Sequence, residues 1–104
     1  MEKENYYDVK ITVLKRLELS DIHKEYAAED FPLICKRNKE GDEYISKNCN
    51  MPSNFCLGAW KVIKDKVLLL ASGKNSPYVK QEGLSIQSCN DGLHPVIYKL
   101  ERII

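Results

Sequence analysis

The first regular element is visible in the alternation of apolar and polar residues near the start of the chain. From Tyr7 onward, the apolar residues Val9, Ile11 and Val13 stand at every second position, with polar residues between them. Successive side chains of a strand point to opposite faces, so a period of two indicates a strand with one buried face. The pattern predicts a strand that begins near Tyr7.

A short helix and a short strand are predicted next. Residues 20–26 contain two side chains that can cap a helix and two apolar side chains one helical turn apart. These four residues are Ser20, Asp21, Ile22 and Tyr26. Pro32 then stops the helix, and residues 36–41 are charged and end in glycine, as is typical of a surface turn. The following segment, Glu43–Ser46, is predicted to be a short strand.

The longest helix is expected in the middle of the chain. Ser53 can cap a helix that begins at Asn54, and apolar residues then recur at helical spacing, which places them on one face. They are Cys56, Trp60, Ile63, Val67 and Leu70. Glycine tolerates the left-handed conformation that often ends a helix, so we expect the end near Ser72-Gly73. The charged residues 64–66 are a candidate point of interruption.

Two further strands are expected after this helix. The segments Leu84–Cys89 and Val96–Ile104 are rich in strand-forming residues, and Asn90-Asp91-Gly92 between them predicts a turn, because an Asp-Gly step tolerates the positive φ that hairpins need. The complete order is strand, helix, strand, helix, strand, strand. This order predicts an α+β fold, with a small mixed or antiparallel sheet, a C-terminal β-hairpin and one main helix packed on the sheet.

Composition sets bounds on size, location and partners. With 104 residues, 43% of them hydrophobic and 30% charged, the chain has the length and composition of a single folded domain. Its 16 basic and 15 acidic side chains give a net charge of +1, which provides no field of one sign to attract nucleic acid or an anionic membrane. The N-terminus is charged, and no apolar stretch approaches the length of a membrane span. We therefore expect a cytoplasmic protein with neither nucleic-acid nor membrane partners.

The four cysteines carry the most suggestive chemistry, and a cytoplasmic location predicts that they are reduced. Cys35 ends an apolar run, Cys56 lies in the first turn of the long predicted helix, and Cys89 ends a strand. The free N–H groups and partial positive charge of a helix's first turn favour a thiolate. Cys56 is thus the candidate catalytic residue, although its place on the apolar face also fits a buried structural cysteine.

A metal site is an alternative use of the same cysteines. Zinc and iron accept four thiolate or imidazole ligands, which Cys35, Cys56 and Cys89 could provide together with Cys49 or His94. The sequence has no Cys-x-x-Cys pair, and the intervals between its cysteines match no common ribbon or finger pattern. We therefore expect no cofactor, with zinc or iron as the alternative.

Signatures of the common enzyme classes are absent from the sequence, among them Gly-x-Ser-x-Gly, the P-loop and the dinucleotide glycine pattern. Neither His23 nor His94 stands in a recognisable catalytic signature. If the first and last strands pair, several basic residues would gather, although Glu18 and Glu101 would dilute their charge. These basic residues are Lys10, Lys15, Arg16, Lys99 and Arg102. We expect a solvated face there rather than a nucleic-acid surface.

Several short motifs are spread over nearly the whole chain. They are residues 9–16, Cys35 with residues 41–44, Met51-Pro52, Phe55-Cys56, Ala59-Trp60, residues 89–93 and residues 95–101. Together they resemble a family of short uncharacterised cysteine-containing proteins that is common in anaerobic bacteria and archaea and has no established activity. The resemblance implies that Cys35, Cys56, Trp60, Cys89, Asp91 and Gly92 fall on the family's motif positions. Cys49 lies outside that pattern, and His94 stands where the family more often has arginine.

These observations favour a binding or accessory module. Its pocket would bring together Cys35, Cys56 and Cys89, with Trp60 and Asp91 as further binding residues, and its partner would be a small molecule or a larger redox enzyme of anaerobic metabolism. The alternatives are a small thiol or redox enzyme, with Cys56 as nucleophile and Cys35 or Cys89 as resolving partner, and a metal-binding protein with cysteine ligands.

Assembly of several copies of the chain is another alternative. Ile97, Ile103 and Ile104 could leave an apolar edge strand that pairs with another chain. A homo-oligomer is therefore among the expected states.

Overall fold

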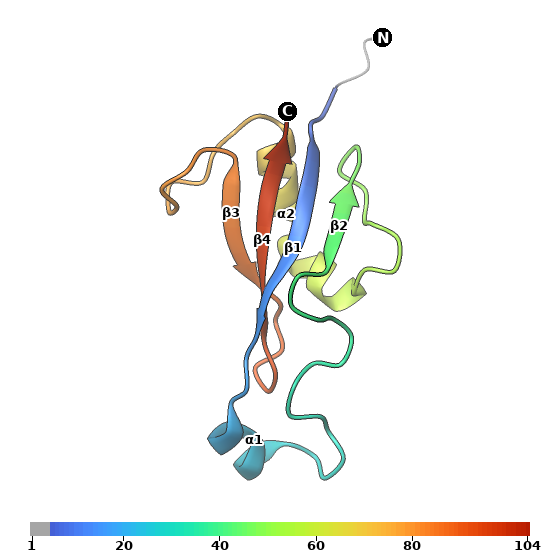
Figure 1. The fold of residues 1–104 in the computed structure, drawn as a ribbon, viewed down its shortest axis with the longest axis vertical. Coiled ribbons are helices and arrows are strands. Elements are labelled where there is room, and N and C mark those ends of the chain that lie inside the picture. Colours follow the sequence, from blue (N-terminus) through green and yellow to red (C-terminus); the bar gives the residue numbers. More distant parts are fainter. Residues whose placement is uncertain (1–4) are drawn as a thin grey trace.

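The computed structural model describes residues 5–104 and confirms the α+β class, with an antiparallel sheet and a main helix packed on it (Figure 1). The sheet contains four strands in the order β2-β1-β4-β3, and every neighbouring pair is antiparallel. The elements in chain order are β1 (Asp8–Arg16), α1 (Ser20–Tyr26), β2 (Glu43–Ser46), α2 (Leu57–Ala71), β3 (Leu84–Ser88) and β4 (Val96–Ile103).

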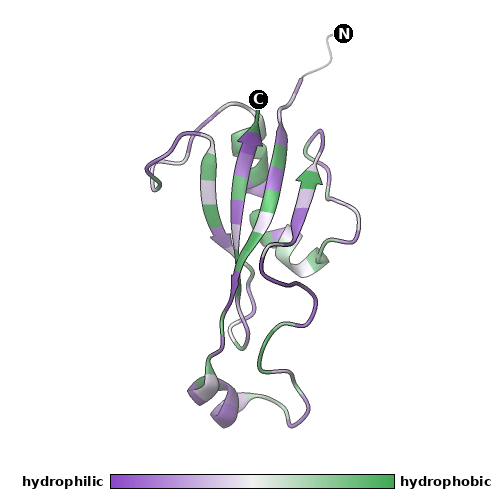
Figure 2. Ribbon diagram, in the orientation of Figure 1, coloured by the Kyte–Doolittle hydropathy of each residue, from purple (hydrophilic) through white to green (hydrophobic). Residues whose placement is uncertain are grey.

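The core lies between α2 and one face of the sheet. Val9, Ile11 and Val13 of β1 are fully buried, as the alternation predicted. Their neighbours on β4 face the same side, because residues paired across a sheet share a face. The core residues of β4 and α2 are Val96, Tyr98, Leu100, Ala59, Ile63, Val67, Leu70 and Ala71. The alternating hydropathy along the strands is visible in Figure 2.

A bulge in β1 changes which residue faces the core side at the end of this strand. Val13 pairs with Tyr98 and Lys15 pairs with Ile97, so Leu14 is the extra residue. Arg16, rather than Lys15, therefore lies opposite the buried Val96. The Arg16 Nη1 donates to the carbonyl oxygen of Cys35 over 3.2 Å, and the carboxylate of Glu40 accepts bonds from the backbone N–H and the Nε of Arg16.

Helix α2 begins three residues later than the sequence predicts. Asn54 adopts a φ of +63°, outside the helical region, and the N-cap position belongs to Cys56. Ser53 therefore does not cap the helix, and that prediction was wrong. The predicted apolar face and C-terminal end are confirmed, since Gly73 has a φ of +88° directly after the helix. The charged residues 64–66 lie inside an unbroken helix.

The C-terminal end of α2 is held by Arg102 of β4. Its Nη1 donates to the carbonyl oxygens of Leu70 and Lys74, over 3.2 and 2.8 Å, and its Nη2 donates to the side chain of Asn75. A cation near the last carbonyl groups of a helix also interacts favourably with the helix dipole. Arg102 thus ties the last strand to the end of the main helix.

Helix α1 lies where the sequence predicts a short helix, and it contributes no residue to the core. None of its residues is buried, and Tyr26 is 72% exposed. Leu19, rather than Ser20 or Asp21, occupies the N-cap position, while the Asp21 Oδ1 accepts a hydrogen bond from the Ile22 N–H in the first turn at 2.9 Å. In Figure 1 the helix lies away from the sheet, and the chain returns from it to β2 through a long loop. The ring of His23 contacts the carbonyl oxygen of Phe31 at 2.6 Å and anchors this loop to the helix.

The C-terminal hairpin of β3 and β4 is confirmed, with each strand one residue shorter than predicted. Its turn differs from the prediction, because Gly92 does not adopt a positive φ. The connection spans residues 89–95, which is too long to require the two-residue turn that an Asp-Gly step favours. Asp91 instead accepts a hydrogen bond from the Leu93 N–H at 2.9 Å and stabilises the loop.

The strand order pairs β1 with β4, which brings Lys10 and Lys99 together beside Glu101, and it removes the expected edge. β4 pairs with β1 and β3, so it lies inside the sheet, and the prediction of an apolar edge formed by Ile97, Ile103 and Ile104 was wrong. On the sheet face opposite α2, Lys10 and Lys99 lie 3.9 and 3.7 Å from Glu101, as expected for a solvated mixture of charges. Among the described residues, no helix is long and apolar enough to cross a membrane.

Candidate functional site

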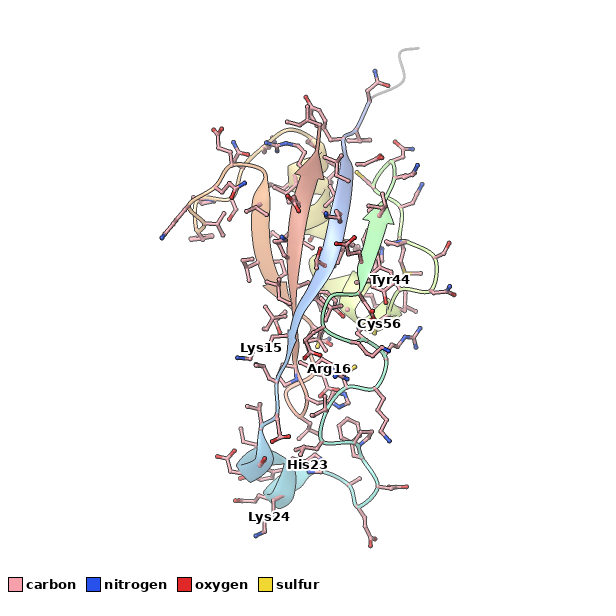
Figure 3. The ribbon with its side chains drawn as sticks, in the orientation of Figure 1. Lys15, Arg16, His23, Lys24, Tyr44 and Cys56 are labelled. Atoms are coloured by element: carbon pink, nitrogen blue, oxygen red, sulfur yellow. The ribbon has the colours of Figure 1, made fainter. Side chains whose placement is uncertain are left out.

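A pocket of about 160 Å³ opens where the start of α2, the hairpin loop and residues 35–38 meet. The predicted residues Cys35, Cys56, Cys89 and Asp91 all line it, although they come from separate parts of the chain. Each of the three thiols is half-buried, and none of the three forms a disulfide bond. Figure 3 shows Cys56 at the start of α2, near Tyr44 of β2. The pocket thus brings together three thiols from three segments.

Each thiol is positioned by a different local feature. Cys56 is the N-cap residue of α2, and its carbonyl oxygen accepts the first helical bond from the Trp60 N–H at 2.9 Å. Cys89 follows the end of β3, where its Sγ accepts a hydrogen bond from the backbone N–H of Val96 at 3.3 Å. Cys35 lies in the loop after α1, and its carbonyl group is held by Arg16. Backbone geometry therefore fixes all three positions.

A buried chain of polar side chains ends in the pocket. The Tyr44 hydroxyl donates to the Asn38 Oδ1 at 2.8 Å, and the Asn38 Nδ2 donates to the Tyr98 hydroxyl oxygen at 2.9 Å. Asn38 is 2% exposed and Tyr98 is 1% exposed, so these bonds satisfy groups that water cannot reach freely. Asn38 and Tyr98 both line the pocket. Because Tyr98 accepts the Asn38 bond, its own O–H proton remains to be donated, and no described residue accepts it.

Burial and charge keep both tyrosines protonated. Burial raises the pKa of Tyr98 well above its usual value of 10, and the nearby Cys56, Cys89 and Cys35 act in the same direction. Burial likewise raises the pKa of Tyr44, with a further contribution from the carboxylate of Asp42. The Tyr98 hydroxyl therefore keeps its proton at physiological pH.

Asp91 and His94 are ionisable residues of the lining. The Asp91 Oδ2 lies 2.9 Å from the His94 Nε2, while the His94 Nδ1 lies 3.2 Å from the carbonyl oxygen of Pro32. Both partners are acceptors, so the imidazolium form satisfies both contacts and a neutral ring satisfies one. Phe31 stacks on His94 with a ring distance of 4.5 Å. The pair thus links the hairpin loop to the loop after α1.

Two other residues that the sequence analysis considered for the site, Trp60 and Cys49, lie outside the pocket. Trp60 is not among the residues that line the pocket; it packs against the core with its ring at 6.3 Å from that of Phe55, edge to face. Cys49 also packs against the core, outside the pocket. Within residues 5–104, no group of three or more His, Cys, Asp or Glu side chains is placed to hold a metal ion.

Sequence reasoning missed Asn38 and Tyr98 as parts of the site. Asn38 lies in the charged stretch that predicted only a surface turn, and Tyr98 looks like an ordinary inward residue of a strand. The one available signal was the alternation along β4, which places Tyr98 on the same face as Val96 and Leu100. A buried tyrosine normally finds a partner for its hydroxyl group, but the sequence does not say which residue it is.

The fold and the site together describe a small α+β protein whose antiparallel sheet is covered on one face by a helix. A pocket lined by thiols lies at one end of this sheet. Comparison with protein-family models, with curated proteins and with solved structures finds no match for this chain. The resemblance to the cysteine-containing family of anaerobes stays a prediction.

Proposed function

We propose that this protein is a binding module whose small-molecule ligand occupies the pocket lined by Cys35, Cys56 and Cys89. The observation that supports the proposal is the convergence of three half-buried thiols, from three segments, on one cavity with a buried hydrogen-bond donor in its wall. Small-molecule sites typically combine an apolar lining with a few convergent polar groups. The cavity has room for about five water molecules, which limits the ligand to a small organic molecule or fragment.

Thiol protection tests the proposal, with Cys49 as an internal control. The native protein is treated with iodoacetamide in the presence and absence of the small-molecule fraction of a cell lysate, and alkylation of each cysteine is followed by peptide mass spectrometry. We expect some fraction to protect Cys35, Cys56 and Cys89 together and saturably, while alkylation of Cys49 is unchanged. Equal alkylation of the three pocket cysteines in every fraction would contradict the proposal.

A second candidate function is thiol chemistry at Cys56. The observation that favours it is the position of Cys56 at the N-cap of α2, beside N–H groups that no side chain caps. In that case iodoacetamide should alkylate Cys56 in the folded protein faster than in the denatured protein at the same pH. A folded-state rate at or below the denatured-state rate would remove the support for this candidate. The Cys56→Ser variant identifies the fast phase.

A further inference from the structure

Strand β3 forms one edge of the sheet, and no strand of the described chain lies beyond it (Figure 1). In an antiparallel ladder, alternate residues of a strand bond to the same neighbour. Gly83 and Cys89, which flank β3, bond to β4 through backbone groups over 2.8 and 3.0 Å. The odd-numbered residues of β3 therefore bond to β4. The even-numbered residues Leu84, Ile86 and Ser88 direct their N–H and C=O groups away from the sheet.

These outward groups are unpaired. Within residues 5–104, no hydrogen bond reaches the backbone N–H or C=O of Leu84, Ile86 or Ser88 from the outer side of the strand. The side chain of Ile86 is 46% exposed, so this edge is open to approach. A row of alternating donors and acceptors on an open edge is a template for another strand.

Strand β3 also lacks the features that usually protect a sheet edge. Charged side chains, proline and β-bulges are common at exposed edges, because each of them disfavours the approach of another strand. The sequence of β3, Leu-Ser-Ile-Gln-Ser, contains no charged residue and no proline, and its register with β4 is regular. The other edge strand, β2, is only four residues long, begins with Glu43 and is followed by Lys47. The unprotected edge is therefore that of β3.

A second copy of β3 matches this edge in register. In an antiparallel pair centred on Ile86, the two Ile86 residues lie opposite each other, and Leu84 of each copy lies opposite Ser88 of the other. All the outward N–H groups then meet outward C=O groups. A shift by one residue would set outward groups against inward ones, and a shift by two would place an outward residue opposite Glu82 or Asn90, outside β3.

The same register joins strands of compatible chemistry. Both strands are uncharged, so pairing removes no charged side chain of β3 from water. Ile86 lies opposite Lys99 on the sheet face away from α2, and the two Ile86 side chains would meet there across the symmetry axis. The match uses one surface patch of each copy, as a two-fold dimer requires.

We infer that β3 is a dimerisation strand: two copies of the chain pair antiparallel through β3, centred on Ile86, and form one continuous sheet with four strands from each copy. The inference goes beyond the proposed binding function and does not depend on a ligand in the pocket. It assigns pairing to β3 and not to the C-terminal strand, because β4 lies inside the sheet.

The oligomeric state and amide exchange test this inference together. Size-exclusion chromatography with light scattering is run on the full chain from micromolar to millimolar concentration, and hydrogen exchange is followed by NMR. We expect a dimer that dissociates on dilution, with slower exchange in the dimer at the amides of Leu84, Ile86 and Ser88. A monomer at every concentration would overturn the inference. A dimer without slower exchange at these three amides would also overturn it.

Ile86→Lys tests the edge directly, with Ile45→Lys as its matched control. Ile45 is 38% exposed and lies on the other edge strand, on the same sheet face as Ile86. Ile86→Lys would set two like charges opposite each other, so the dimer dissociation constant should rise by about tenfold or more. Ile45→Lys should leave this constant unchanged. Equal effects of the two variants, or no effect of folded Ile86→Lys, would contradict the inference.

Cysteine cross-linking tests the register and does not depend on the folding of Ile86→Lys. In the proposed register the two Cα atoms at position 86 are about 5.5 Å apart, within reach of a disulfide. The two residues at position 84 are offset by four residues, or about 13 Å along the strands. With oxidised glutathione as the oxidant, Ile86→Cys chains should form a dimer linked through position 86, identified by peptide mass spectrometry. Leu84→Cys chains should form no link between their positions 84. A link at position 84, or none at position 86, would refute the pairing.

Discussion

Replacing Asn38 by alanine tests whether the buried polar chain stabilises the fold. The change removes both side-chain bonds, the one accepted from Tyr44 at 2.8 Å and the one donated to Tyr98 at 2.9 Å. Each is worth about 0.5–1.5 kcal/mol net, and a buried hydroxyl left without its partner adds about 1–3 kcal/mol. Tyr44 is only partly buried and can turn to water, so the extra cost falls on Tyr98. The expected loss for Asn38→Ala is about 2–6 kcal/mol in the free energy of unfolding.

Urea denaturation measures this loss. With a denaturant slope of about 2 kcal/mol per molar, typical of a small domain, the midpoint should fall by about 1–3 M at an unchanged slope. A double-mutant cycle identifies the source of the loss. In a Tyr98→Phe background the cost of Asn38→Ala should be smaller by about 1 kcal/mol, because the bond between the two residues is already absent. A loss below about 0.5 kcal/mol, or equal losses in both backgrounds, would refute the reasoning.

Three more predictions concern single groups. Arg102→Ala should lower the free energy of unfolding by about 1–3 kcal/mol in urea denaturation, because three hydrogen bonds at the end of α2 are lost, and a change within about 0.5 kcal/mol would contradict this role. The backbone N–H of Arg16 holds the pKa of Glu40 below 4.5, so the stability that this carboxylate contributes is present above pH 4.5 and is lost as the pH falls through the lowered pKa. In the Glu40→Gln variant the free energy of unfolding should therefore fall less steeply than in the wild type as the pH is lowered from about pH 5. The same pH dependence in both proteins would contradict a stabilising contact between Glu40 and Arg16. Because burial raises the pKa of Tyr98, the stability that the neutral Tyr98 side chain contributes is present below pH 10 and is lost at higher pH. In an alkaline titration followed by phenolate absorbance, the Tyr98→Phe variant should lack one tyrosine that ionises late, together with unfolding. If the variant instead lacked a tyrosine that ionises before unfolding, the burial of Tyr98 would be contradicted.

Local patterns were sufficient for much of the fold. The alternation of Val9, Ile11 and Val13 predicted β1, and the bounds of β2 were correct, because a strand that buries one face must alternate. The buried positions of α2 followed from the helical spacing of Ile63, Val67 and Leu70 for the same reason. In each case the signal and the structure are produced by the same few neighbouring residues.

Predictions that depended on single backbone angles or on distant partners were less successful. Asn54 takes a φ of +63°, which delays α2 and moves Cys56 from the first turn to the N-cap. The bulge at Leu14 turns Arg16 rather than Lys15 toward the core side of the sheet. Neither the left-handed conformation of Asn54 nor the bulge at Leu14 can be read from the hydrophobic periodicity, because both depend on contacts with elements that are remote in sequence.

The sequence by itself determined the class of fold, the main apolar faces and the cysteines as the residues to follow. Only the tertiary structure decided that Cys35, Cys56 and Cys89 share one pocket and that Tyr98, which accepts a hydrogen bond from Asn38, lies in its lining. Asn38 and Tyr98 are 60 residues apart, and they meet because β4 pairs with β1 inside the sheet while the loop after α1 returns beside β2. Contacts of this kind arise from the closure of long loops around a common core, and no local pattern of side chains records them.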